Sequence, residues 1–409
     1  MDIKIFRKVF LPAVGLFFFL SCSVALFSLA RLALVIPSED AAELVLSKIL
    51  KVVLQILFVC AIWILAKYVP FERVFRRVMI AFIGVISLFT GLSFFQGLSE
   101  IIAPLFNNIS NLFSFSFVSI LIWGFINRVT VFSVGIKYYL LLAFVFMVIE
   151  GVILNLLVLF LGSSYLPLYA LLIPALIMMV FALILFNRAW KGIPEEFLYP
   201  KEDKTNLKIR FPYISAAYLL AGSIVINRLM TILFKSDVRR EIPDPEMYSH
   251  FMGTYSSTVG IATIVFAFFW MGLGTLSLLK KGWKFTAFLG VSSLLIGGAI
   301  FLGFTILTEF SLYWLPYGVY SGLLLGTTSA LFFPLIQVLY LYLPSNARFR
   351  TKVVTEMIFL SLMAVIPTLI TQGLLVQLTS INPIAIYLEL LTPIALLLLF
   401  VAVIRLRRL

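Results

Sequence analysis

Charge, histidine and cysteine are all scarce in this chain. Of its 409 residues, 12% are charged, two are cysteine and one is histidine, whereas 62% are hydrophobic. So few charges cannot cover the surface of a soluble protein of this length, which excludes that class. His250 alone excludes a histidine-based metal site or catalytic triad, and Cys22 and Cys60, both inside apolar runs, form no disulfide framework. We therefore expect no enzymatic activity, no metal and no cofactor.

Two further absences concern nucleotides and nucleic acids. No Walker loop is present, so ATP hydrolysis is not the expected energy source. A net charge of +13 would suggest a nucleic-acid partner in a soluble protein. Here the mean hydropathy is +1.12, and Lys and Arg instead mark the loops of a membrane protein that stay in the cytoplasm. We expect the lipid bilayer as a partner, and no nucleic acid.

Long apolar segments are what the chain has in abundance. They are continuous rather than alternating, which is typical of membrane helices. Segments of bilayer length fall at about 9–34, 49–68, 78–99, 112–132, 138–162, 165–187, 211–234, 251–279, 284–308, 312–343, 353–378 and 382–404. The first lacks a signal cleavage site, so we interpret it as an uncleaved span. Pro316 and Pro334 predict a kink in the segment 312–343. The sequence thus predicts an all-α membrane protein with twelve transmembrane helices.

The basic residues orient these spans. Twelve spans place 24 of the 31 Lys and Arg in gaps on one side. This asymmetry predicts a bacterial inner-membrane protein with both termini in the cytoplasm. The longest polar gap, 190–210, is predicted to link two six-helix bundles of similar layout, 1–189 and 211–409. Two such bundles with a site between them are typical of the major-facilitator fold.

A series of short motifs follows one another from span seven to span nine. They are Tyr213, Ile226–Asn227, Phe234–Lys235–Ser236, Pro243–Asp244–Pro245, Tyr248–Ser249, Phe251–Met252–Gly253, Val259–Gly260–Ile261 and Gly282–Trp283. Other parts of the chain add Arg31 before Leu34–Val35–Ile36, the stretch from Ile122 to Asn127, and Tyr340 followed by Arg348, Arg350, Lys352 and Glu356. In this order the motifs resemble those of the ATP/ADP translocase family of obligate intracellular bacteria and plastids.

This resemblance implies a major-facilitator fold and the exchange of nucleotides such as ATP and ADP. It implies that Arg31 holds a substrate phosphate, which a guanidinium can do in a bidentate manner; the alternative is that Arg31 reaches to the outer headgroups. It also makes Asn127 and Lys235 candidate substrate-binding residues. Lys235 would close the outer mouth of the site or mark the membrane interface.

Two ionisable residues inside spans are candidate functional residues, because placing an ionisable side chain in the bilayer costs free energy. Arg228 in span seven is either a cation for an anionic substrate or part of an ion pair between helices. Glu150 in span five is either a coupling carboxylate or the structural partner of an arginine. Arg348, Lys352 and Glu356 form a cluster at the start of span eleven. It is predicted to be a cytoplasmic gate or a cluster that only sets topology.

Three positions where the resemblance implies charge are neutral here: Asn111, Thr231 and Ile336. The first hypothesis is therefore a carrier of a nucleotide or another phosphate-bearing anion, working by alternating access. The second is a transporter re-purposed for a lipid or a less charged metabolite. The third is a membrane-complex subunit that no longer transports.

Overall fold

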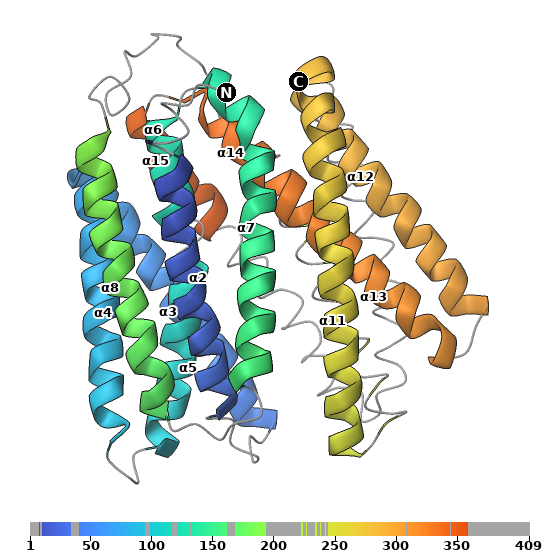
Figure 1. Ribbon diagram of the computed structural model, residues 1–409, viewed down its shortest axis with the longest axis horizontal. Helices are drawn as coiled ribbons and strands as arrows, with labels where there is room; N and C mark the ends of the chain where they lie inside the picture. Colours follow the sequence, from blue (N-terminus) through green and yellow to red (C-terminus); the bar gives the residue numbers. More distant parts are fainter. Residues whose placement is uncertain are drawn as a thin grey trace. The chain divides into compact units, whose positions relative to one another are not determined.

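The computed structural model describes residues 8, 10–33, 41–94, 99–116, 121–130, 132–161, 168–193, 222–223, 226, 234, 238, 242, 244–307, 310–343 and 345–358. Every element in these residues is a helix (Figure 1). The chain divides into two compact units. Unit 1 comprises Met1–Phe132, Val148–Thr205 and Tyr340–Ile358, and unit 2 comprises Ser133–Met147, Asn206–Leu339 and Phe359–Leu409. The predicted boundaries at 190–210 stay a prediction, because most of that segment lies outside the described residues.

Unit 1 is built mainly from the first half of the chain. Its helices are α2 (Leu11–Ala33), α3 (Ala41–Tyr68), α4 (Phe71–Leu92), α5 (Ser99–Ser116), α6 (Trp123–Val129) and α8 (Leu168–Gly192), with α15 (Ser345–Lys352) and the π-helical segment η5 (Val353–Ile358) added from far along the sequence. A further helix, α7 (Phe132–Leu161), has sections in both units.

Helix α4 shows why these segments pack as they do. Its buried residues, among them Phe71, Phe75 and Phe82, recur every three or four positions and so form one face. That face contacts α8, where Phe75 stacks on Phe186 with ring centroids 3.7 Å apart. In Figure 1 the two helices run side by side. The aromatic face therefore fixes the α4–α8 pair.

Unit 2 holds α11 (Pro245–Phe269), the π-helical η3 (Trp270–Gly274), α12 (Thr275–Leu307), α13 (Phe310–Thr327), the π-helical η4 (Thr328–Phe332) and most of α14 (Phe333–Tyr340). Asp244 caps α11, because its carboxylate accepts a hydrogen bond from the Met247 amide (3.1 Å). Gly318, Gly322 and Gly326 let α13 approach α11 closely: a Cβ at Gly322 would lie 2.4 Å from the Ala262 Cβ.

Two predicted breaks coincide with irregular backbone. The basic turn between 279 and 284 contains Gly282, whose φ of 82° is a left-handed conformation that favours glycine. In the segment 312–343, the π-helical η4 interrupts the α-helix just before Pro334, whereas α13 continues through Pro316. A proline removes one backbone donor, which accounts for a break at Pro334.

Several helices extend beyond the predicted spans, among them α4 and α5. α4 begins at Phe71 rather than at about 78, since its basic residues occupy the exposed face of an amphipathic first turn. α5 covers 100–111, which the prediction left as a gap. The polar side chains there bond within the helix: Asn111 Nδ2 donates to the Asn107 carbonyl oxygen (2.7 Å), and Ser110 Oγ donates to the same oxygen (3.1 Å). The polar residues therefore do not mark a loop here, because the carbonyl groups of the helix accept hydrogen bonds from their side chains.

Five described helical segments are long and apolar enough to cross a membrane. They are Phe71–Leu92, Ser133–Ile153, Tyr169–Gly192, Ser257–Phe301 and Trp314–Tyr340, with shorter apolar helices at Leu11–Phe27 and Val53–Leu65. The all-α membrane class is thus confirmed. The count of twelve stays a prediction, because the expected span 382–404 and almost all of 211–234 and 353–378 lie outside the described residues.

Candidate functional site

The predicted gate residues lie together in unit 1. α15 carries Arg348 and Lys352, and η5 carries Glu356. α15 packs against α6 and α3, and η5 packs against α3. Residues about 220 positions apart in sequence therefore meet at the ends of short helices. We call this group the α6–α15 cluster: Asn127, Thr130, Tyr340, Arg348, Lys352, Thr355 and Glu356.

Arg348 is the centre of the hydrogen bonding in this cluster. Only 8% of it is exposed. Nη1 donates to the carbonyl oxygens of Asn127 (2.9 Å) and Thr130 (3.0 Å). Nη2 donates to the Leu341 carbonyl oxygen (3.1 Å), and Nε to that of Leu343 (2.7 Å). One guanidinium thus joins the end of α6 to the chain that follows Tyr340.

The electrostatics of this arrangement follow from where helices end. The last carbonyl groups of a helix have no partner within it, and the C-terminus carries partial negative charge. α6 ends at Val129, and Thr130 is already extended, with φ −112° and ψ 138°. The fixed positive charge of Arg348 therefore binds dipoles that a helix end leaves unsatisfied, and these charge-assisted bonds offset part of the cost of burying it.

Lys352 and Glu356 form a second buried charged contact. Lys352 Nζ lies 3.6 Å from Glu356 Oε2, and the two side chains are 2% and 1% exposed. Lys352 lies outside the five candidate spans found among the described residues. Burial lowers its pKa from 10.5 to about 8, and the charge of Glu356 opposes that shift. The ammonium thus has a weaker hold on its proton than an exposed lysine.

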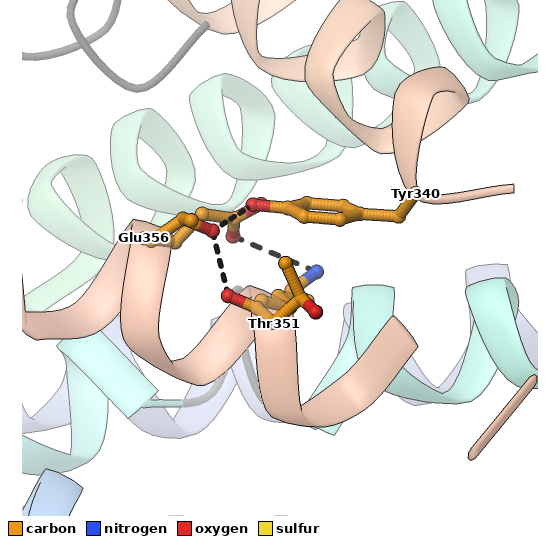
Figure 2. A network of polar contacts seen from close by, with 5 residues as sticks. Tyr340, Thr351 and Glu356 are labelled. Carbon is orange, nitrogen blue, oxygen red and sulfur yellow. Dashed lines mark hydrogen bonds and ion pairs between the residues drawn. The ribbon is translucent and has the colours of Figure 1, made fainter. Parts of the chain in front are cut away.

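Hydroxyl groups join Tyr340 to the helical turn that carries this ion pair (Figure 2). The Tyr340 hydroxyl forms a short hydrogen bond with Thr355 Oγ1, and Thr355 Oγ1 donates to the Thr351 carbonyl oxygen (2.8 Å). In Figure 2 the Tyr340 ring points at the turn that carries Glu356. Tyr340, α15 and η5 are therefore joined by polar contacts, and the irregular turn of η5 begins directly after Lys352.

Aromatic packing holds α15 against the rest of unit 1. The rings of Phe349 and Phe71 meet edge to face with centroids 5.0 Å apart. They pack where Gly124 leaves space, since a Cβ at Gly124 would lie 2.8 Å from Phe71 Cε2. Trp190 adds a ring 6.1 Å from that of Phe71. Apolar packing thus holds α15 in place, and the burial of Arg348 shields its polar contacts from water, which strengthens them.

Comparison with known proteins gives the family. A sequence model described as TLC ATP/ADP transporter matches residues 201–409, about half of the chain. The chain belongs to the TLC ATP/ADP transporter family. Among curated proteins, ADP,ATP carrier protein 1 of Chlamydia muridarum is 29% identical over 103 residues. That match covers 25% of this chain and 19% of the Chlamydia carrier. The resemblance stated from the motifs is confirmed at the level of the family.

Solved structures give the fold of this TLC-family carrier. A bacterial homologue of the iron transporter ferroportin, in an outward-facing state, superimposes with a TM-score of 0.68 at 13% identity, covering 96% of this chain and 98% of that one. FucP, a major-facilitator transporter in the outward conformation, gives 0.62 at 13% identity, covering 96% and 97%. The major-facilitator fold is therefore confirmed.

The structure brings together some of the predicted site residues of this TLC-family carrier. Asn127 is buried beside Arg348 and contributes its backbone carbonyl. Glu150 is exposed on α7, and no ion pair joins it to another residue that the structure describes. Arg31 lies in the last turn of α2, but its side chain is outside the described residues, as are Arg228 and Lys235 altogether.

Thr130, Thr355 and the carbonyls of Leu341 and Leu343 were not predicted from the sequence. The last two groups are backbone atoms at chain turns, which no side-chain pattern marks. Thr130 is buried, and its Oγ1 has no hydrogen-bond partner among the described residues. The available signal was the position of a helix end, because a short helix that ends at an extended residue leaves backbone carbonyl groups for a cation to bind.

Proposed function

We propose that this TLC-family transporter carries a nucleotide or another phosphate-bearing anion by alternating access. The α6–α15 cluster acts as the gate that closes one end of the path. The charge asymmetry of the loops predicts that this is the cytoplasmic end, in a bacterial inner membrane with both termini inside.

The observation that carries the proposal is the set of four Arg348 hydrogen bonds. A gate must hold two segments firmly in one state and release them in another. Bonds from one side chain to carbonyl groups at helix ends meet this need. These hydrogen bonds are strong when water is excluded. When the two segments separate, water can hydrate both the guanidinium and the carbonyl groups. The buried Thr130 hydroxyl supports the same role, because it has no hydrogen-bond partner among the described residues in this state and a change of its surroundings can supply one.

Support for the substrate class comes from the family and from charge. The matched Chlamydia protein is described as an ADP,ATP carrier. We propose Arg31, Arg228 and Lys235 as ligands of phosphate oxygens, since cations inside spans are costly and mark substrate paths. Glu150, exposed within the span Ser133–Ile153, is proposed to face the substrate path as a coupling carboxylate.

The test is uptake of labelled ATP into intact cells of a heterologous bacterium that expresses the full chain, with ADP or phosphate in excess outside. We expect saturable uptake that ADP suppresses, and loss of uptake in Arg31→Ala at equal membrane expression. Lys280→Ala removes an exposed cation from unit 2 and serves as the matched control, with uptake unchanged. No uptake by verified membrane-inserted protein refutes the nucleotide proposal.

A second candidate is a carrier of a lipid or a less charged metabolite. Asn111 and Ile336 favour it, since both stand where the resemblance implies a charge. Asn111 is satisfied within α5 and Ile336 is buried. Such a carrier keeps the gate but takes up no ATP. Screening less charged solutes would identify its substrate. Loss of that transport in Arg348→Gln would then distinguish the carrier from a non-transporting subunit.

A further inference from the structure

Exposed cations gather at one end of the α4–α8 pair. Arg73 and Arg77 lie one turn apart on α4, and Arg188 and Lys191 lie one turn apart on α8. All four are exposed, and none forms an ion pair with another residue that the structure describes. Both pairs stand at the end of their helix, the start of α4 and the finish of α8.

Two contacts hold these ends together. Arg76 Nε donates to Asn187 Oδ1 (2.7 Å), and the stacked rings of Phe75 and Phe186 lie directly beside it. The same Arg76 also pairs with Glu72 (2.6 Å). Glu72 is the one acidic residue of the described stretches 67–77 and 187–193, and its charge is thus already balanced. Among the described residues, this surface therefore keeps four positive charges that no ion pair balances.

The exposed residues form stripes that continue away from the cations. On α4 the exposed positions after Arg77 include Ile80, Gly84 and Leu88; on α8 those before Arg188 include Ile177 and Ile184. Each set follows the helical repeat of three or four residues, so it forms one stripe. Since the contact through Arg76 and Asn187 lies at the edge of both stripes, they border a common outer surface of unit 1.

We propose that this surface binds an acidic phospholipid. The headgroup phosphate lies among Arg73, Arg77, Arg188 and Lys191, and the acyl chains follow the apolar stripes below them. A cluster of basic residues at the membrane surface attracts anionic headgroups by about 1 kcal/mol per charge, which is a factor of roughly 5 in affinity. A free phosphate uses only the charges, in full contact with water, whereas a lipid uses the charges and the stripes together.

The test measures lipid retained by the full chain. We would purify it in detergent, add dioleoylphosphatidylglycerol or dioleoylphosphatidylcholine, and count bound lipid by native mass spectrometry. Thermal unfolding midpoints with each lipid and with inorganic phosphate give an independent readout. We expect phosphatidylglycerol to be retained and to raise the midpoint, with little effect from phosphatidylcholine or phosphate. In Arg73→Gln/Arg77→Gln, and likewise in Arg188→Gln/Lys191→Gln, affinity falls by roughly 25-fold.

Two controls keep the outcome clear. Lys280→Gln/Lys281→Gln removes two exposed cations beside the Gly282 kink of α12, and should leave retention unchanged. Arg73→Lys/Arg77→Lys keeps the charge and should retain the lipid, which separates binding from misfolding. Equal loss in the Lys280/Lys281 variant would mean diffuse attraction rather than a site. An equal midpoint rise with phosphate alone would mean a site for free anions, and equal retention of phosphatidylcholine would mean contact through acyl chains only. Each of these three results overturns the proposal.

Discussion

Replacing Arg348 by glutamine should open the proposed gate without unfolding the protein. Arg348 donates four hydrogen bonds to carbonyl groups. A carboxamide has two N–H donors on a shorter chain, so at least two bonds are lost. At about 1.5–3 kcal/mol for a bond from a charged group, the loss is about 3–6 kcal/mol. Relief from burying a charge offsets part of it.

If about 2–3 kcal/mol of this loss falls on the closed state alone, the ratio of open to closed molecules rises by roughly 30- to 160-fold. The accessibility of a cysteine introduced by Thr130→Cys can report that ratio, because Thr130 is buried beside Arg348. The Thr130 hydroxyl makes no hydrogen bond to another described residue, so this substitution should disturb little. Cys22 and Cys60 would first be replaced by serine.

The measurement is the rate at which N-ethylmaleimide, which crosses membranes, labels the introduced thiol well below the unfolding temperature. We expect labelling to be faster in Arg348→Gln, and unchanged in the control Lys280→Gln. A rate that stays at the value found with Arg348 intact, while the unfolding midpoint falls, would refute the reasoning. Arg348 would then stabilise unit 1 without taking part in a gate.

Two further predictions concern packing and pH. Gly322→Ala places a Cβ 2.4 Å from one on α11 and should destabilise unit 2 by about 1–3 kcal/mol; Gly91→Ala, where nothing lies within 4 Å, is the control, and equal midpoints in thermal unfolding would contradict the prediction. Burial lowers the Lys352 pKa from 10.5 to about 8, so between these two values the unfolded chain binds more protons, and the free energy of unfolding rises with pH. The rise from about pH 7 to 9, on the order of 1 kcal/mol, should be present in the wild type and absent in Lys352→Met/Glu356→Gln; a fall in the wild type relative to that variant would contradict it.

The helices of this chain could be predicted where apolar runs are long, and less well where polar residues occur inside them. The spans around α7, α8 and α11 follow directly from hydropathy. α5 does not, because Asn111 and Ser110 look like loop residues until their bonds to the preceding turn are seen. The first turn of α4 was missed for a related reason. Its arginines lie on the exposed face, while Phe71 and Phe75 are buried.

The candidate site was predictable in part. Arg348, Lys352 and Glu356 stand out in sequence as charges at the start of an apolar run. The spacing of four residues also predicts that Lys352 and Glu356 pair. No pattern predicts the partners of Arg348 on α6, because they are backbone carbonyls more than 200 positions away. A carbonyl group is the same in every residue, so only the fold decides which ones a guanidinium reaches.

The two buried cations of the α6–α15 cluster have different polar partners, and this explains why arginine and lysine are not interchangeable there. Arg348 donates to four carbonyls, which requires several donors fixed in one plane and a charge that does not titrate. Lys352 faces the carboxylate of Glu356, for which a compact ammonium is sufficient. Its burial leaves that proton within reach of moderately alkaline pH. The arginine contacts should therefore hold at any physiological pH. Loss of one proton from Lys352 weakens its contact with Glu356. Of the two cations, only Lys352 can therefore make the closed state of the gate sensitive to pH.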